Sequence, residues 1–197
     1  MTVIFARTPL LLAALFSLAS TVSVRSESRS IDPARSTLDV FVYKSGLFSA
    51  LADNHVIRAP IDEGRINDTG GLAMELTVKS AGLTVMDPGL SADKRAEVAT
   101  RMHGPDVLDS ATYPTIHFVS ERITPEGPSQ WRVAGALTLH GVSRPVGGLV
   151  TLKDGHYRGS MSIRQRDFGI QPISIAGGAV KVKDELRIAF DIVTVSR

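Results

Sequence analysis

The chain has 197 residues, of which 43% are hydrophobic and 21% are charged, a balance typical of a globular domain rather than a disordered one. Its 22 lysines and arginines against 20 acidic residues give no excess of positive charge that would favour nucleic-acid binding. The absence of cysteine excludes disulfides, a thiolate nucleophile and a sulfur-ligated metal.

The first 19 residues are typical of a secretory signal peptide. Arg7 supplies a positive charge, the apolar run PLLLAALFSL follows over residues 9–18, and small residues come next. This run is shorter than the roughly 20 apolar residues that a membrane-spanning helix needs. We predict cleavage after Ala19, with cleavage after Ser23 and an uncleaved anchor as alternatives. The mature domain is predicted over residues 30–197, in a periplasmic or secreted location.

Most of the mature chain alternates apolar and polar residues with a period of two, which indicates antiparallel strands with one buried face. The clearest runs are residues 38–42, 72–78, 133–139, 157–163 and 186–192. The dipeptide Asp154-Gly155 predicts a two-residue hairpin, and residues 140–145 predict a longer connection. We therefore expect an all-β domain of about eight antiparallel strands.

One segment, residues 91–102, departs from this pattern. Its sequence SADKRAEVATRM is rich in helix formers, and Ser91 suits the N-cap position with Asp93 in the first turn. Gly104-Pro105 would end the helix. We predict one short helix inserted between the third and fourth strands.

Four segments, in this order, resemble the YceI-like family of exported polyisoprenoid-binding barrels. They are residues 31–38 (IDPARSTL), 106–120 (DVLDSATYPTIHFVS), 135–142 (GALTLHGV) and 166–170 (RDFGI). The resemblance implies an antiparallel lipocalin-like β-barrel whose apolar interior holds an isoprenoid chain, such as a quinone, a polyprenol or a polyprenyl phosphate. It also implies dimers. Members of one branch carry a His-x-His pair after the first strand, where this chain has ADNH at residues 52–55.

A lipid carrier needs apolar side chains that point inward without filling the interior. Burying ten carbons contributes roughly 8 kcal/mol before association costs, which corresponds to about micromolar binding at best. Longer prenyl chains would bind more tightly, so no catalytic group is required. Candidates to line the cavity are Leu47, Phe48, Leu76, Val78, Phe118, Leu137, Leu139, Met161, Ile163 and Phe168. For each of them a filled core is the alternative. Strand glycines such as Gly135 and Gly159 favour space inside the barrel, or equally mark bends.

A polar head group would need polar residues at one mouth of the barrel. Arg164 and Arg166 lie where a strand ends, and His140 lies at the head of a turn. An arginine could bind a phosphate or a carbonyl there, and His140 could donate to a carbonyl. The alternative is that these side chains stabilise their own turns and local ion pairs.

Two other classes of function compete with a lipid carrier. The first is a metal site or a hydrolytic enzyme, because Asp53 and His55 would face the same side of a strand. The other histidines are scattered, and the sequence has neither a His-Glu-x-x-His run nor a Gly-x-Ser-x-Gly elbow. The second is a filled barrel that acts as an interaction module and exposes an apolar patch.

We therefore predict a non-catalytic, exported protein that carries or stores an isoprenoid lipid or quinone and uses no cofactor. The expected partners beyond that ligand are a second copy of the chain and, transiently, a membrane, with no nucleic acid. The helix at residues 91–102 is expected to cap or gate one mouth of the barrel.

Overall fold

The computed structural model describes residues 28–45, 54–67, 71–175 and 180–195. The predicted signal peptide, Leu47, Phe48 and Asp53 lie outside these ranges. Among the described residues, no helix has the length and apolar character needed to span a membrane.

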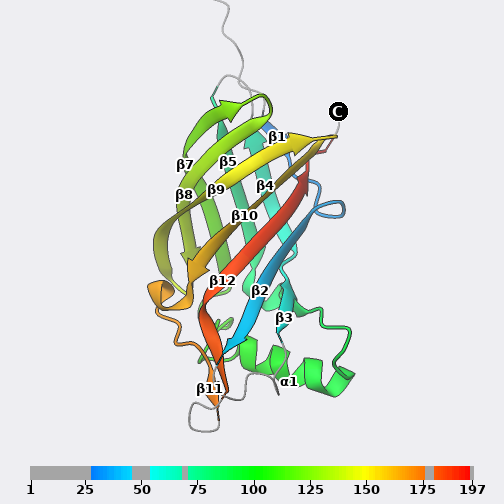
Figure 1. Ribbon diagram of the computed structural model, residues 1–197, viewed down its shortest axis with the longest axis vertical. Helices are drawn as coiled ribbons and strands as arrows, with labels where there is room; N and C mark the ends of the chain where they lie inside the picture. The colour runs from blue at the N-terminus through cyan, green and yellow to red at the C-terminus, as the bar shows by residue number, and fades with distance from the viewer. Residues whose placement is uncertain (1–27, 46–53, 68–70, 176–179, 196–197) are drawn as a thin grey trace, which may run out of the picture.

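Within the described ranges, twelve strands form one antiparallel sheet that curls into a barrel (Figure 1). Eleven of them are hydrogen-bonded in the order β1-β4-β5-β7-β8-β9-β10-β12-β2-β3-β6, and β11 pairs with β12 beside this path. Their bounds are β1 Ser28–Ser30, β2 Thr37–Ser45, β3 His55–Arg58, β4 Ile61–Asn67, β5 Ala73–Lys79, β6 Thr84–Val85, β7 Thr115–Gly127, β8 Gln130–Leu139, β9 Val142–Lys153, β10 His156–Arg164, β11 Ser174–Ile175 and β12 Val180–Val193. The prediction of an all-β antiparallel barrel is confirmed.

The sheet closes because two of its strands bend instead of ending. β3 continues into β4 through Ala59-Pro60, where proline cannot donate a ladder hydrogen bond, and β5 continues into β6 through the 3-10 turn η2 (Ser80–Gly82). Since β3 pairs with β2 and β4 pairs with β5, the order of neighbours returns to its start. With β3/β4 and β5/β6 each counted once, the ring consists of β2, β3/β4, β5/β6, β7, β8, β9, β10 and β12, in agreement with the predicted eight.

The segment after β1 completes the closure at one end. The Ile31 N–H donates to the Gly64 carbonyl of β4 (2.9 Å), and the Asp32 N–H donates to the Val193 carbonyl of β12 (2.8 Å). Ile31 also forms an antiparallel bridge with Thr194. Strand β4 is thereby joined to the end of β12 through β1 and the segment that follows it, and this end of the barrel has a continuous wall.

Turn residues connect the strands largely as their chemistry dictates. Asp154 and Gly155 both have positive φ (53° and 78°) in the tight turn between β9 and β10, as predicted. The longer connection predicted over residues 140–145 is wrong, because β8 ends at Leu139 and β9 begins at Val142. His140 and Gly141 (φ 51° and 71°) form the turn alone. Pro145 is tolerated in β9 because β10 pairs only with Leu149 and later residues.

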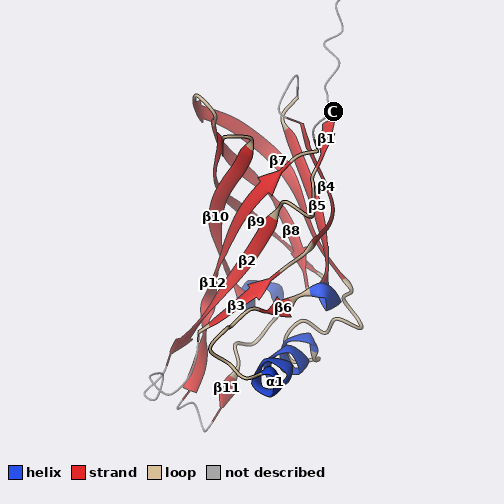
Figure 2. Ribbon diagram, turned by 90° about the vertical axis from the view of Figure 1, so that its right-hand side faces the viewer, coloured by secondary structure: helices blue, strands red, loops and turns tan. Residues whose placement is uncertain are grey.

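The predicted helix is α1 (Ala92–His103), which lies between β6 and β7. The Ser91 hydroxyl accepts a hydrogen bond from the Lys94 N–H (3.3 Å), as expected of an N-cap. Figure 2 shows α1 beneath β3 and β6, across one end of the barrel. None of its residues is fully buried.

Candidate functional site

The end of the barrel at the β7–β8 hairpin is filled. The rings of Trp131 and Tyr157 lie with centroids 6.3 Å apart, and Arg29 donates to the Tyr157 hydroxyl (2.5 Å). The space left between them is about 30 Å³, room for little more than one water. It is lined by Ile66, Asn67, Leu72, Met74, Ile123, Trp131, Val133, Val150, Tyr157 and Phe190.

The opposite end, next to α1, contains a cavity of about 430 Å³. This volume falls within the range of about 300–1,000 Å³ typical of small-molecule sites. Strands β2, β3 and β12 form one wall, and α1 with the segments flanking it forms the other. The apolar side chains that line it are Val40, Val42, Ile57, Leu83, Leu90, Val98, Met102, Val107, Leu108, Ile173, Val182 and Leu186.

Strand alternation explains the apolar wall. The register sets Val40 between Ile57 of β3 and Ile188 of β12, and it sets Val42 beside Leu186. Both valines therefore point inward, yet they are only half-buried. Inward side chains with remaining exposure indicate that nothing packs against them from across the interior.

One face of α1 forms the other side of the cavity. Lys94, Glu97, Val98, Arg101 and Met102 all line it, at the three- and four-residue spacing that places side chains on one helix face. The stems and apolar members of this set face empty space instead of a packed layer. This accounts for a twelve-residue helix with no fully buried side chain.

The polar lining residues gather mainly positive charge near α1 and the ends of β2 and β12. Lys44, Lys94, Arg101 and Lys181 contribute four cations, and Glu97 contributes one carboxylate, 3.2 Å from Lys94. The remaining polar lining residues are Tyr43, His55 and Gln165. The cavity thus combines an apolar wall with a polar, cationic border.

His55 is held within this lining by a buried carboxylate. Its Nδ1 lies 2.6 Å from Oδ2 of Asp87, whose side chain is only 10% exposed. The other carboxylate oxygen, Oδ1, accepts a hydrogen bond from the Val56 N–H (2.8 Å). Arg95 of α1 donates to the backbone carbonyls of Asp87 and Leu90. The orientation of His55 therefore depends on a segment that is also attached to the helix.

The wall also carries an ion pair on its outer face. Arg58 of β3 donates from Nε and Nη2 to Asp39 of β2, with Nη2 3.1 Å from Oδ2. The hydrogen bond to Asp39 raises the pKa of Arg58, against the opposite effect of partial burial. This pair joins the two strands that carry Val40 and Ile57.

The predicted lining residues within the described ranges lie elsewhere in the barrel. All except the half-buried Met161 belong to the buried core. None is among the side chains that line the 430 Å³ cavity, so their contact with a ligand stays a prediction. They are Leu76, Val78, Phe118, Leu137, Leu139, Met161, Ile163 and Phe168.

Two strand glycines do not enlarge the interior. A Cβ at Gly135 would lie 2.9 Å from the Phe118 ring, and a Cβ at Gly159 would lie 2.6 Å from the Phe190 ring. The expectation that they favour space inside is therefore wrong at these positions. Each glycine accommodates an aromatic ring that fills the core.

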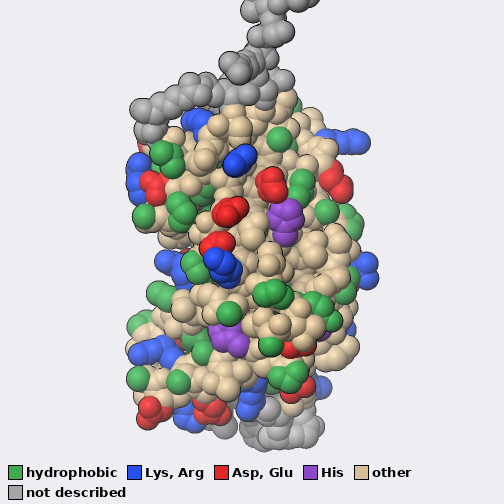
Figure 3. All heavy atoms as spheres, turned by 180° about the vertical axis from the view of Figure 1, so that it is seen from behind, with side chains coloured by type: hydrophobic (Ala, Val, Ile, Leu, Met, Phe, Trp, Pro, Cys, Tyr) green, Lys and Arg blue, Asp and Glu red, His purple; other side chains and the backbone are tan. Residues whose placement is uncertain are grey.

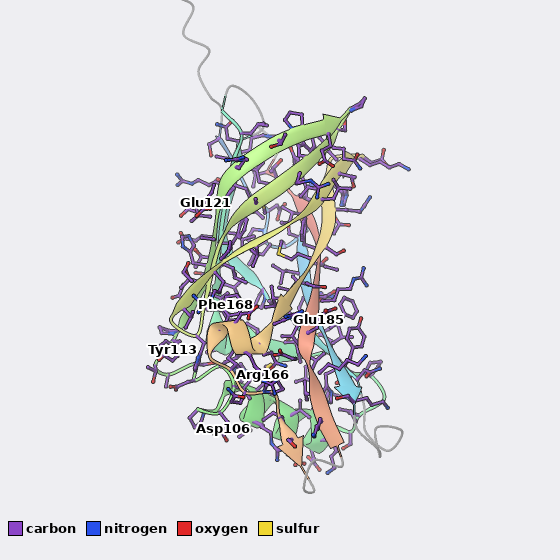
Figure 4. All side chains as sticks on the ribbon, turned by 60° about the vertical axis from the view of Figure 1, so that its left-hand side comes forward. Asp106, Tyr113, Glu121, Arg166, Phe168 and Glu185 are labelled. Atoms are coloured by element: carbon purple, nitrogen blue, oxygen red, sulfur yellow. The ribbon has the colours of Figure 1, made fainter. Side chains whose placement is uncertain are left out.

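The predicted head-group residues lie around the short helix η3 (Gln165–Phe168). Figure 4 shows Arg166 and Phe168 on this helix, close to Tyr113. His140 packs against the Tyr113 ring (centroids 4.4 Å apart), and its Nδ1 lies 3.2 Å from the Phe168 carbonyl oxygen. Arg164 and Arg166 are exposed, whereas Gln165 between them lines the cavity. Their role toward a head group stays a prediction.

Two observations from the described part of the chain, which does not include Asp53, bear on the competing interpretations. No three histidine or carboxylate side chains there come close enough to hold a metal. On the face seen in Figure 3, hydrophobic side chains are scattered among charged ones. The large exposed apolar residues Met86, Val119, Leu149 and Val195 come from separate segments.

Sequence reasoning missed Asp87 and the cavity residues on and around α1. Asp87 is followed by Pro88-Gly89, so its local signal is that of a turn. Its partner His55 lies 32 residues away in the chain. The pairing of β3 with β6, continued by the hydrogen bond from the Met86 N–H to the Val56 carbonyl (2.8 Å), places the two side chains together.

Comparison with curated relatives gives a partial match. The chain is 37% identical over 86 residues to a UPF0312 protein of Pseudomonas savastanoi pv. phaseolicola, and to one of Pseudomonas syringae pv. syringae. The match covers 39% of this chain and 45% of each relative, so the chain spans less than half the length of these curated relatives.

Solved structures and a family model extend this similarity to nearly the whole described chain. The crystal structure of Burkholderia cenocepacia BcnA matches with a TM-score of 0.60 and 21% identity, over 84% of this chain and 99% of that one. A mutant of the Campylobacter jejuni YCEI protein matches with a TM-score of 0.50 and 14% identity, over 100% and 94% of the two chains. At such low sequence identity, these structural matches show a common fold and nothing more. Because the model of the YceI-like domain matches residues 30–194, the chain belongs to the YceI-like family.

Proposed function

We propose that this protein binds an isoprenoid lipid in the cavity beside α1 and carries or stores it without chemical change. The observation that carries the proposal is the 430 Å³ apolar cavity, at one end of a barrel whose other end is filled. The YceI-like family is known for binding polyisoprenoids, which agrees with this use of the cavity.

The energetics need no special chemistry. Each methylene-sized group removed from water contributes about 0.8 kcal/mol, so a chain of ten buried carbons contributes roughly 8 kcal/mol before association costs. That gross figure corresponds to about micromolar affinity at best, and a longer isoprenoid chain, which buries more carbons, would bind more tightly. A cavity of drug-sized volume would take one part of a longer isoprenoid, and the cationic border would lie near its polar end.

The helix α1 is the part of the wall best suited to move. Its inner face meets the cavity, and its inward residues Val98 and Met102 would gain contacts when a ligand enters. Opening of α1 therefore breaks few packed contacts in the empty protein and more in the loaded one. Ligand exchange would follow movement of this helix.

The cellular setting of the proposal follows from the predicted signal peptide. An exported carrier would protect an isoprenoid chain from water in the periplasm or outside the cell. Homodimer formation and transient contact with a membrane remain predictions alongside it.

A cavity-blocking variant tests the proposal. The mature protein is purified from its host and examined by native mass spectrometry with lipid extraction, as wild type, Val40→Trp and Phe41→Trp. Val40 lines the cavity, whereas its neighbour Phe41 lies on the outer face against Arg187 (5.4 Å from the ring centroid). We expect a stoichiometric isoprenoid with wild type and F41W, and a loss of at least tenfold in bound lipid with V40W.

Circular dichroism provides the control for folding of each variant. A wild-type protein that is empty and also fails to bind added polyprenols and quinones would contradict the proposal. Equal lipid content in V40W and F41W would place the ligand outside this cavity.

A further inference from the structure

Asp87 holds the imidazole of His55 in a fixed orientation at the wall of a largely apolar cavity. His55 lines the cavity directly, and its side chain retains 22% exposure. Its cross-strand neighbour Val42 is apolar, and so is Ile57, two residues further along the same strand. A polar atom facing such surroundings is costly to leave unpaired and can therefore discriminate between ligands.

We propose that Nε2 of His55 recognises the polar end of the ligand by accepting a hydrogen bond from a hydroxyl group. The ligand class is then an isoprenoid alcohol or hydroquinone, in preference to an ether or a quinone. This inference rests on the proposed function, because it assigns the head group of a lipid in the same cavity.

The hydrogen-bonding role of Nε2 depends on which ring nitrogen of His55 carries the hydrogen. A carboxylate can only accept hydrogen bonds, so Nδ1, 2.6 Å from Asp87 Oδ2, must be the N–H. In the neutral imidazole the other nitrogen is then an acceptor. No described residue donates to Nε2, so within these ranges the acceptor is available to a ligand hydroxyl.

The structure fixes Asp87 against rotation. Its Oδ1 accepts the Val56 N–H at 2.8 Å while Oδ2 faces the imidazole, and the residue is buried. The backbone carbonyl of Asp87 in turn accepts from Arg95 of α1 (3.2 Å). Asp87 is thus a positioning residue that sets the tautomer of His55 without touching the ligand.

This arrangement makes Asp87→Asn an informative substitution. The Val56 N–H still requires an oxygen, so the amide oxygen takes the Oδ1 place and the NH₂ group faces His55. The NH₂ group donates to Nδ1, and Nε2 becomes the N–H of the neutral ring. The variant should then prefer a ligand that accepts a hydrogen bond, which a merely structural role of Asp87 would not produce.

The test compares farnesol with farnesyl methyl ether. The two share one isoprenoid chain, but a methyl group replaces the hydroxyl hydrogen in the ether. Affinities are measured by displacement of 1-anilinonaphthalene-8-sulfonate from the wild-type mature protein and from H55F, D87N and H117Q. His117 is a matched control, because it contacts Glu75 (3.1 Å) on the outer face of the barrel.

We expect wild type and H117Q to bind farnesol about tenfold more tightly than the ether. H55F should bind both with equal affinity, and D87N should bind the ether at least as tightly as the alcohol. Circular dichroism checks that each variant is folded, and D87N supplies an independent test if H55F is not.

Equal affinities in wild type would overturn the inference, as would a preference for the alcohol that survives in H55F or D87N. Both results leave isoprenoid binding itself intact. If neither compound displaces the probe from wild type, and native mass spectrometry also finds no isoprenoid, the proposed function fails and this inference fails with it.

Discussion

Strand β12 passes through both ends of the barrel and shows how differently they are built. Ile192, at the filled end, has no exposed surface, whereas Leu186, on the same face of the strand at the hollow end, is only half-buried. The filled end has Trp131, Tyr157 and Phe190 pointing inward, and the hollow end has mainly aliphatic residues. The placement of large aromatic residues along the barrel, not the alternation, therefore decides where space remains.

A pair of truncations on β12 gives the strongest test of the difference in packing between the two ends. Ile192→Ala removes methyl groups from a packed site and should lower the free energy of unfolding by about 2–5 kcal/mol. Leu186→Ala, at the cavity wall, should cost about 1 kcal/mol or less, because little packing is lost. Urea unfolding of both variants measures the difference. Equal losses would mean that the cavity end is as tightly packed as the other.

A second substitution tests how the filled end is packed. A Cβ at Gly159 would lie 2.5 Å from the Leu149 carbonyl oxygen and 2.6 Å from the Phe190 ring. Gly159→Ala should therefore lower the free energy of unfolding by about 1–3 kcal/mol, since the backbone itself must shift. Gly127→Ala is the matched control, because the nearest atom to its Cβ would be 3.8 Å away. Similar urea midpoints for the two variants would contradict this account.

The helix at the hollow end should respond locally rather than globally. Ser91→Ala removes the N-cap hydrogen bond to Lys94, worth about 1 kcal/mol to the helix. Because α1 has no fully buried residue, we expect faster hydrogen exchange over residues 92–103 with an unchanged urea midpoint. Mass-spectrometric hydrogen exchange distinguishes local opening of α1 from a loss of global stability, and Ser162→Ala on β10 is the control. A fall in the urea midpoint would show that α1 is part of the cooperative core.

The smallest expected effect on stability comes from Asp191, on the outer surface of the filled end. Partial burial raises the pKa of Asp191, but hydrogen bonds from Arg158 (2.8 Å) and His156 (2.5 Å) outweigh it and lower the pKa overall. Because the pKa of Asp191 is lower in the folded state, its ionised carboxylate stabilises the fold at pH values above the unfolded-state pKa of about 3.9. This stabilisation is lost as the pH falls through the folded-state pKa.

Asp191→Asn should therefore lower the free energy of unfolding by less than about 1 kcal/mol at pH 7, because the group is partly exposed. The difference from wild type should shrink as the pH falls below about 4. Urea titrations at pH 7, 4 and 2.5 measure it. A difference that stays constant across these values would show that the carboxylate charge is not its cause.

The fold was predictable wherever a local signal decides the structure. The N-cap at Ser91, the turn at Asp154-Gly155 and the inward alternation of Val133, Leu137 and Leu139 all follow from neighbours in the chain. The bend at Pro60 that closes the ring was not predictable in this way, because it depends on which strands pair on either side of it.

The candidate site was less predictable for the same physical reason. Alternation identifies Leu76 and Val40 equally as inward-facing, yet only Val40 lines the cavity. The difference lies in what stands opposite each side chain across the barrel, which depends on the tertiary structure. The contact between His55 and Asp87 likewise arises from strand pairing and leaves no pattern in the sequence.

The aromatic plug of Trp131 and Tyr157 has a consequence for the route of any ligand. In the described part of the chain it makes the cavity a dead end, so a ligand leaves through the mouth by which it entered. A molecule that entered chain-first would keep its polar end at that mouth, next to α1. Under the proposed function, whatever receives the lipid would approach the helix end of the barrel and would meet the head group before the chain.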